Sequence, residues 1–189
     1  MQRWIPAILM VLLLVGFRVL GSAMPETLPN FQPLPALLLC GVIFLTGTQR
    51  WLIPMIAWVV TDPLTSLLQH RPVLGWHHLE IALGLAATVA IARRVRRSPN
   101  WLNLLGSAAL AALAFYVVTN TISFVVDPLY PRTLTGFVQA QWTGPAGYGP
   151  TWLFLRNLLA ANLLFTALFS LACRTLPQSF SETAPAIAR

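Results

Sequence analysis

Six long apolar runs dominate this 189-residue chain. They cover residues 4–20, 34–48, 51–68, 76–92, 101–126 and 151–173. A helix needs about 20 predominantly apolar residues, with a range of about 17–25, to cross the hydrocarbon core of a bilayer. We therefore expect an all-α membrane protein whose residues 1–175 form one bundle of six transmembrane helices, the second of them short.

The composition excludes the common alternatives to a membrane protein. Hydrophobic residues make up 57% of the chain and charged residues 9%, whereas a soluble domain has roughly 25% charged residues. An ordinary soluble enzyme, a disordered chain and a disulfide scaffold are thereby excluded. Cys40 and Cys173 both lie in apolar runs, where free thiols behave as small buried hydrophobes.

The basic residues predict an orientation. All 12 are arginines and most stand at the ends of apolar runs, which is typical of membrane topology and does not indicate a nucleic-acid partner. Arg93, Arg94, Arg96 and Arg97 form the densest cluster, and loops rich in Arg face the cytoplasm. With six crossings both termini are then cytoplasmic, in a bacterial inner membrane, and residues 176–189 form a flexible cytoplasmic tail.

The first apolar run has a second interpretation. Met1-Gln2-Arg3 followed by an apolar stretch and by Gly21-Ser22-Ala23 also fits a cleavable signal peptide. Arg18 interrupts the approach to that cleavage region, so we interpret the run as a membrane helix.

Polar side chains collect at the predicted outer ends of the runs. Ionisable groups are costly in lipid and normally face the bundle interior or a wet cavity. We therefore predict an outward-facing pocket that binds a small-molecule ligand, and the alternative is a set of hydrogen bonds that only joins helices. The predicted pocket residues are Arg18, Asn30, Asp62, Glu80, Tyr116, Asn120 and Asp127.

Within this set, Arg18 and Asp62 either pair with each other or hold a charged ligand, because an isolated buried charge would be very costly. Trp58, Asp62, Thr65 and Gln69 lie at helical spacing on one face. Pro63 follows Asp62, which predicts a kink or break of the third helix at this point. Similarly, Tyr116, Asn120, Ser123 and Asp127 form a stripe on the fifth run.

We expect neither a cofactor nor a metal. His70, His77 and His78 show no tight ligand spacing, and they suit an interfacial belt equally well. Nor do we expect an enzyme, because the chain has no Gly-x-Ser-x-Gly, His-Glu-x-x-His or Ser–His arrangement. It also lacks a nucleotide-binding motif, so any active transport would draw energy from a partner or an ion gradient.

The loop 127–150 is longer than most connections. Leu134, Phe137, Val138 and Trp142 have the spacing of a short amphipathic helix, and a glycine-rich stretch follows at 144–150. This outer helix is either a lid over the pocket or an interfacial cover.

Small residues mark the fourth run. Ala82, Ala86 and Ala90 recur every four residues, which lets another helix approach closely. They serve internal packing or a docking face, and the docking face suggests an alternative function as a non-catalytic accessory subunit of a larger membrane complex.

Several short motifs together carry a resemblance that spans residues 17–173. They are Arg18, Pro29-Asn30-Phe31-Gln32-Pro33, Asp62, the segment from Phe115 to Asn120, and Tyr130-Pro131-Arg132-Thr133-Leu134-Thr135-Gly136. The chain resembles an uncharacterised bacterial family of small multi-pass membrane proteins, a domain of unknown function. Asn30, Asp62, Asn120 and Tyr130 match polar positions of that family.

That family is in turn similar in layout to the substrate-binding S components of energy-coupling factor transporters. The resemblance implies six helices and an outward pocket for a vitamin or related micronutrient, with transporter subunits as partners. S components typically carry Ala-x-x-x-Ala on helix one for docking, whereas this chain reads Ala7-Ile8-Leu9-Met10-Val11.

Overall fold

The computed structural model describes residues 5–24, 27–70, 72–96 and 100–175, and these residues form seven helices and no strand. The helices are α1 (Ile5–Ala23), α2 (Leu34–Phe44), α3 (Gln49–Leu68), α4 (His77–Val95), α5 (Trp101–Val126), α6 (Leu134–Gln141) and α7 (Trp152–Thr175). The all-α prediction is confirmed. The predicted tail, residues 176–189, and Arg97 lie outside the described residues.

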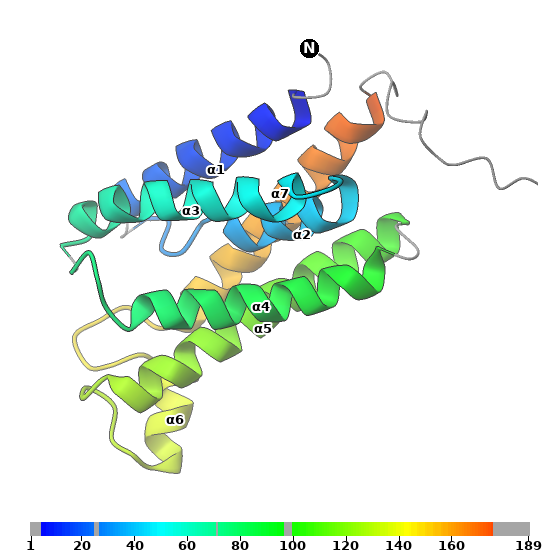
Figure 1. Ribbon diagram of the computed structural model, residues 1–189. Helices are drawn as coiled ribbons and strands as arrows, with labels where there is room; N and C mark the ends of the chain where they lie inside the picture. Colours follow the sequence, from blue (N-terminus) through cyan, green and yellow to red (C-terminus); the bar gives the residue numbers. More distant parts are fainter. Residues whose placement is uncertain (1–4, 25–26, 71, 97–99, 176–189) are drawn as a thin grey trace, which may run out of the picture.

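The long helices run between two ends of one bundle. In Figure 1, α1, α3 and α5 run one way, and α2, α4 and α7 run the other. One end, which we call the α6 end, gathers the last turns of α1, α3 and α5, the first turns of α4 and α7, and α6 itself (Figure 1). The opposite end holds the start of α1 and the end of α7.

The short helix α2 is the centre of the bundle. It has 11 residues, and every position from Leu34 to Ile43 is buried. It contacts α1, α3, α4, α5 and α7. Its apolar residues have no preferred side, as expected of a helix enclosed by others.

The predicted transmembrane helix over residues 34–48 is therefore wrong. Eleven residues of α-helix rise about 16 Å, roughly half of the 30 Å hydrocarbon core. The helix begins after Pro33 and ends where Leu45 turns extended, with φ −86° and ψ 156°. The run is apolar because it is buried inside the protein. Composition alone does not distinguish this burial from burial in lipid.

Three of the described helices are long and apolar enough to cross a membrane, instead of the six predicted. They span Gln49–Leu68, Trp101–Val126 and Trp152–Cys173. Helix α4 falls short because it carries Glu80, Arg93 and Arg94 within 19 residues. In α1 the described apolar stretch, Val11–Ala23, is too short.

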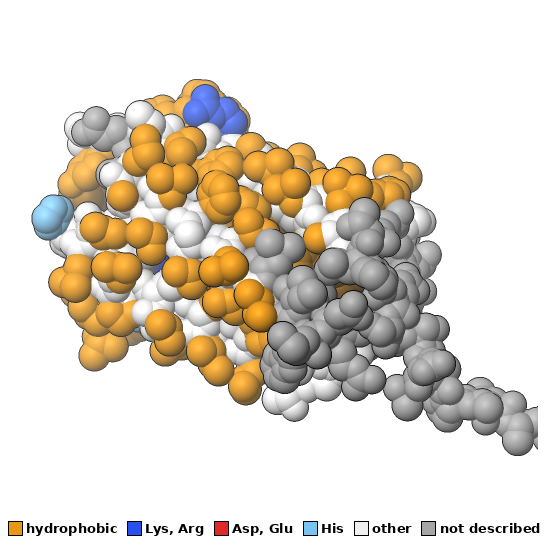
Figure 2. All heavy atoms as spheres, turned by 90° about the horizontal axis from the view of Figure 1, so that it is seen from above, with side chains coloured by type: hydrophobic (Ala, Val, Ile, Leu, Met, Phe, Trp, Pro, Cys, Tyr) orange, Lys and Arg blue, Asp and Glu red, His pale blue; other side chains and the backbone are white. Residues whose placement is uncertain are grey.

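The outside of the bundle is strongly apolar. Figure 2 looks down on the α1–α3 side, and hydrophobic side chains cover most of the visible described surface, with basic and histidine side chains at its margins. Val59, Val60 and Leu67 of α3 are 60%, 68% and 64% exposed. Exposed apolar surface on this scale marks a membrane or protein contact, and together with three helices long and apolar enough to cross a bilayer it favours association with a membrane.

Helix α3 continues through both of its prolines, so of the predicted kink or break at Asp62 the break is wrong. Pro54 and Pro63 lie inside the helix Gln49–Leu68. Each proline removes one backbone donor, but the flanking turns stay helical. The face containing Trp58, Asp62 and Thr65 is buried, and this burial offsets the lost hydrogen bonds.

Candidate ligand-binding site

A partly buried cluster of charged and ionisable side chains lies at the α6 end, between α1, α3 and α4. We call Arg18, Asp62, His77 and His78 the Asp62 cluster. Arg18 Nη2 lies 2.6 Å from Asp62 Oδ1, and the two side chains are only 5% and 4% exposed. Of the two alternatives for Arg18 and Asp62, the structure shows the direct pair.

Neighbouring polar contacts hold α1 against α3 beside this pair. Arg18 Nη2 also donates to Thr65 Oγ1 at 3.4 Å, and Gln69 Nε2 donates to Ser22 Oγ at 3.3 Å. The α3 stripe predicted from spacing is thus the face that meets α1, because side chains four apart project to the same side of a helix.

Both histidines of the cluster approach the other carboxylate oxygen of Asp62. His78 Nε2 lies 2.9 Å and His77 Nε2 3.6 Å from Asp62 Oδ2. The three ligand atoms lie within 4.8 Å of one another. Consecutive residues inside a helix point in different directions. The two rings nevertheless lie close together at the first turn of α4, with 4.1 Å between their centroids.

Gly75 positions the two histidine rings. Its carbonyl oxygen lies 3.1 Å from His78 Nδ1, and a Cβ added to it would come within 3.1 Å of His77 Nδ1. A residue without a side chain at this position therefore leaves room for His77 while its backbone fixes His78.

A small cavity opens beside the cluster. Its volume is about 170 Å³. Asp62 and His78 provide its ionisable groups, and Trp58 and Leu74 are among its apolar walls. Cavities that hold drug-sized ligands usually measure about 300–1,000 Å³, so this one suits a ligand of a few atoms.

Three of the other predicted pocket residues make contacts elsewhere. We call Glu80, Tyr116, Asn120, Ser123 and Gln141 the Tyr116 region. Ser123 Oγ donates to Glu80 Oε1 at 3.1 Å, Asn120 Nδ2 donates to the Tyr116 carbonyl at 2.9 Å, and the Tyr116 hydroxyl donates to the Gln141 carbonyl. The first of these bonds joins α5 to α4, the second lies within α5, and the third joins α5 to α6.

Asn30 and Asp127 stabilise turns. Asn30 has φ +57°, a left-handed conformation that asparagine tolerates better than most residues, and its Oδ1 accepts from Gln32 Nε2 at 2.7 Å. Asp127 Oδ1 accepts from the Leu129 N–H at 2.9 Å. Burial, reinforced by the charge of Asp127, raises the pKa of the Tyr130 phenol. Of the seven predicted pocket residues, the structure brings Arg18 and Asp62 together in the Asp62 cluster, and Glu80, Tyr116 and Asn120 lie apart from them in the Tyr116 region.

The predicted short helix of the 127–150 loop is confirmed as α6. Thr133 caps it by accepting from the Gly136 N–H at 3.2 Å. The helix packs on α5, where Phe137 meets Phe124 with 5.5 Å between ring centroids. Figure 1 places α6 on the far side of α4 and α5 from α1 and α3, so it covers the end of α5, away from the Asp62 cluster.

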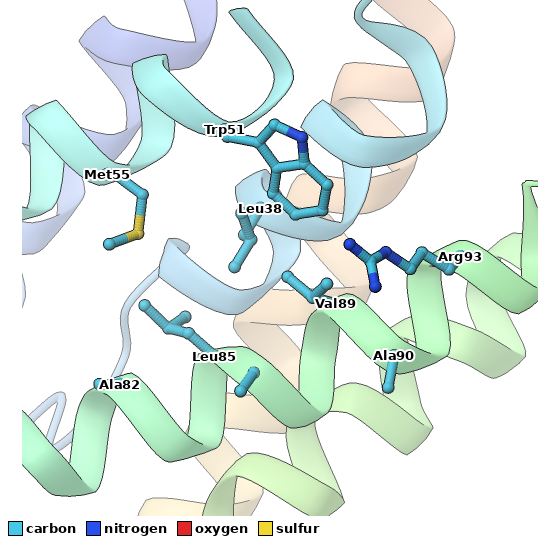
Figure 3. Close-up of a pocket in the computed structure, with 9 residues that line it drawn as sticks. Leu38, Trp51, Met55, Ala82, Leu85, Val89, Ala90 and Arg93 are labelled. Carbon is cyan, nitrogen blue, oxygen red and sulfur yellow. The ribbon is translucent and has the colours of Figure 1, made fainter. Parts of the chain in front are cut away.

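A second, apolar hollow lies between α3 and α4. It has a volume of about 410 Å³ and is lined by Leu38, Trp51, Met55, Ala82, Leu85, Ala86, Val89, Ala90 and Arg93. Figure 3 shows Trp51 and Met55 of α3 facing α4 across it, with Arg93 near the Trp51 end. The three alanines at four-residue spacing are exposed and line this groove.

His77 and His78 were not predicted as partners of Asp62. The spacing of the histidines alone does not indicate a metal site, because the third group comes from the preceding helix. A usable signal was present, because Asp62 stands near the end of one run and the histidines at the start of the next. Antiparallel neighbours joined by a short loop bring such ends together.

Comparison with known proteins places the chain in a family. A family model described as a family of unknown function, DUF6580, matches residues 1–184. The chain belongs to this family. Membership agrees with the resemblance to an uncharacterised domain. No curated protein and no solved structure matches the chain, so the likeness to S components remains a prediction.

Proposed function

We propose that this DUF6580 protein is an integral protein of a bacterial cytoplasmic membrane that captures a small solute at the Asp62 cluster for uptake, in the manner of an S component. The observation that carries the proposal is the convergence of Arg18, Asp62, His77 and His78, from three helices, beside a cavity at one end of the bundle. Nothing in this role requires catalysis.

Energetic cost favours a functional role for the cluster. Ionisable side chains inside a membrane bundle are costly and commonly mark solute pathways. A buried ion pair is often no more stabilising than well-packed apolar residues. A charged cluster between apolar helices is therefore better explained by a ligand than by stability.

The volume of the cavity limits the size of the solute that it can hold. A volume of about 170 Å³ admits an ion or a molecule of a few atoms. We therefore propose a solute smaller than the vitamins that S components carry.

The arginines support an orientation with the cluster outside. Arg50 lies in the first turn of α3, and Arg93, Arg94 and Arg96 lie at the end of α4, all away from the α6 end. The excess of Arg on this side indicates the cytoplasm. With the alternating helix directions of Figure 1, both termini are then cytoplasmic.

Thermal unfolding of the detergent-purified chain tests the proposal. We would screen small carboxylic acids, inorganic anions and divalent cations against the wild type and Asp62→Asn, with Glu80→Gln as the matched control. At least one solute should raise the Tm of the wild type and of Glu80→Gln, but not of Asp62→Asn. No shift with any solute, or an equal shift in Asp62→Asn, would refute capture at this cluster.

The groove between α3 and α4 favours a second function, as a non-catalytic subunit of a membrane complex. The occupant would be a transmembrane helix of a partner protein. The exposed alanines at helical spacing allow close helix approach, and the lining is almost wholly apolar except for Arg93.

Photo-crosslinking in native membranes tests this alternative. A crosslinker at Ala86, which lines the groove, should capture one defined partner, and a crosslinker at Leu83, which is 45% exposed on the same helix, should not. Lipid adducts alone, or equal capture from both positions, would remove the support for a subunit.

A further inference from the structure

We infer that Asp62, His77 and His78 bind one divalent transition-metal ion. The inference rests on the proposed function, because it names the class of solute that the Asp62 cluster accepts. Three ligand atoms, Asp62 Oδ2 and the two histidine Nε2 atoms, lie within 4.8 Å of one another. A metal about 2.0–2.2 Å from each atom is compatible with separations of this size after small adjustments.

The hydrogen bond of His78 fixes which of its nitrogens faces the site. Its Nδ1 lies 3.1 Å from the Gly75 carbonyl oxygen, and a carbonyl can only accept, so Nδ1 carries the proton. In the neutral ring, Nε2 then directs a lone pair toward Asp62 Oδ2, 2.9 Å away. Two lone pairs at this distance repel, so the contact requires a cation, either a second proton on the ring or a metal ion shared with the carboxylate. An Nδ1–H bond to a backbone carbonyl is the usual support of a metal-ligating histidine.

The contact with Arg18 orients the Asp62 carboxylate toward the proposed metal site. Arg18 holds Oδ1 at 2.6 Å, which leaves Oδ2 on the histidine side. The arginine also shares the charge of the carboxylate, so the site should hold a cation less tightly than a structural zinc site. Such binding suits a solute that must be released.

The chemical types of the three ligand groups indicate which metal ions the site prefers. Imidazole nitrogens with one carboxylate suit Zn²⁺, Ni²⁺, Co²⁺ and Cu²⁺, whereas Mg²⁺ and Ca²⁺ prefer oxygen ligands. Three protein ligands leave one position of a tetrahedron vacant. The cavity bounded by Asp62, His78, Trp58 and Leu74 offers space for water or an exchanging anion there.

The test is metal binding by the full chain, purified in detergent without a histidine tag and treated with EDTA. We expect about one equivalent of Zn²⁺ by calorimetry and none of Mg²⁺. Co²⁺ should give visible absorption bands of low symmetry. His77→Ala and His78→Gln should each weaken Zn²⁺ binding by about tenfold or more. His70→Ala is the matched control, because His70 is exposed and lies beyond α3.

The outcomes separate this inference from the proposed function. Stoichiometric Zn²⁺ binding that is lost in both cluster variants and kept in His70→Ala supports the metal site. Absent binding, or equal weakening by His70→Ala, overturns it. If Zn²⁺ fails while another solute stabilises the wild type but not Asp62→Asn, the capture function stands without the metal. If every solute fails as well, both are wrong. Melting curves in EDTA verify that each variant is folded.

Discussion

The Asp62 cluster and the Tyr116 region occupy the same end of the bundle, but their polar side chains are held by different kinds of contact. In the Tyr116 region, hydroxyl, amide and carboxylate groups contact partners on the same or an adjoining element. In the Asp62 cluster, an arginine from α1 and two histidines from α4 share a single carboxylate from α3.

This difference indicates that the Tyr116 region has a structural role and that the Asp62 cluster is the candidate binding site. Local hydrogen bonds contribute modestly and nearly independently to stability. A shared buried carboxylate couples three helices, so removing one partner leaves charge exposed to an apolar interior. Substitutions should therefore have large effects in the cluster and small effects in the Tyr116 region.

The largest effect is expected from breaking the ion pair. Arg18→Met leaves the Asp62 carboxylate buried without its strongest partner, which should cost about 3–5 kcal/mol of the free energy of unfolding. Thermal or denaturant unfolding in detergent measures this loss. Arg18→Met combined with Asp62→Leu should recover much of it. A double variant as unstable as the sum of both single variants would contradict the coupling.

The next effect tests the packing that connects the two regions. A Cβ on Gly84 of α4 would lie 2.6 Å from the Phe115 ring of α5, and overpacking of this kind costs about 1–3 kcal/mol. We expect Gly84→Ala to lower the midpoint of unfolding. Gly106→Ala is the control, since nothing lies within 4 Å of its added Cβ, and it should leave stability unchanged or slightly higher.

The contrast also explains what the sequence could predict. Helical class, the Arg18–Asp62 pair as one of two alternatives, and α6 followed from apolar periodicity, from the cost of isolated charge and from the spacing of Leu134, Phe137 and Val138. These features depend on local patterns or on strong energetic constraints, and both can be recognised from the amino-acid sequence.

The remaining features depend on neighbours that the pattern does not specify. An apolar run such as that of α2 is the same in lipid and in a protein core, so its length and enclosure were missed. The residues predicted to line one pocket lie in different places, because Glu80 contacts Ser123 and Tyr116 contacts α6. Which face of a helix meets which neighbour is set by packing. The convergence of His77 and His78 depended on the loop geometry at Gly75.

A moderate effect is expected where α6 meets α5. Tyr116→Phe removes the hydroxyl that donates to the Gln141 carbonyl, which should cost about 1 kcal/mol. Amide hydrogen exchange should accelerate in α6 while it stays unchanged in α3. Tyr148→Phe is the matched control, because Tyr148 is 68% exposed. Faster exchange in α3 as well as in α6 would show that the two regions are not independent.

The smallest effect concerns Asp127, a predicted pocket residue that the structure assigns to a turn. Its Oδ1 accepts from the Leu129 N–H, a contact that the amide oxygen of asparagine can reproduce. Asp127→Asn should therefore leave unfolding and solute binding unchanged, and Asp127→Ala should cost about 0.5–1.5 kcal/mol. Calorimetric titration beside thermal unfolding measures both quantities. Weaker solute binding in Asp127→Asn would mean that the charge of Asp127 acts on the ligand, and the binding site would then extend from the Asp62 cluster toward the end of α5.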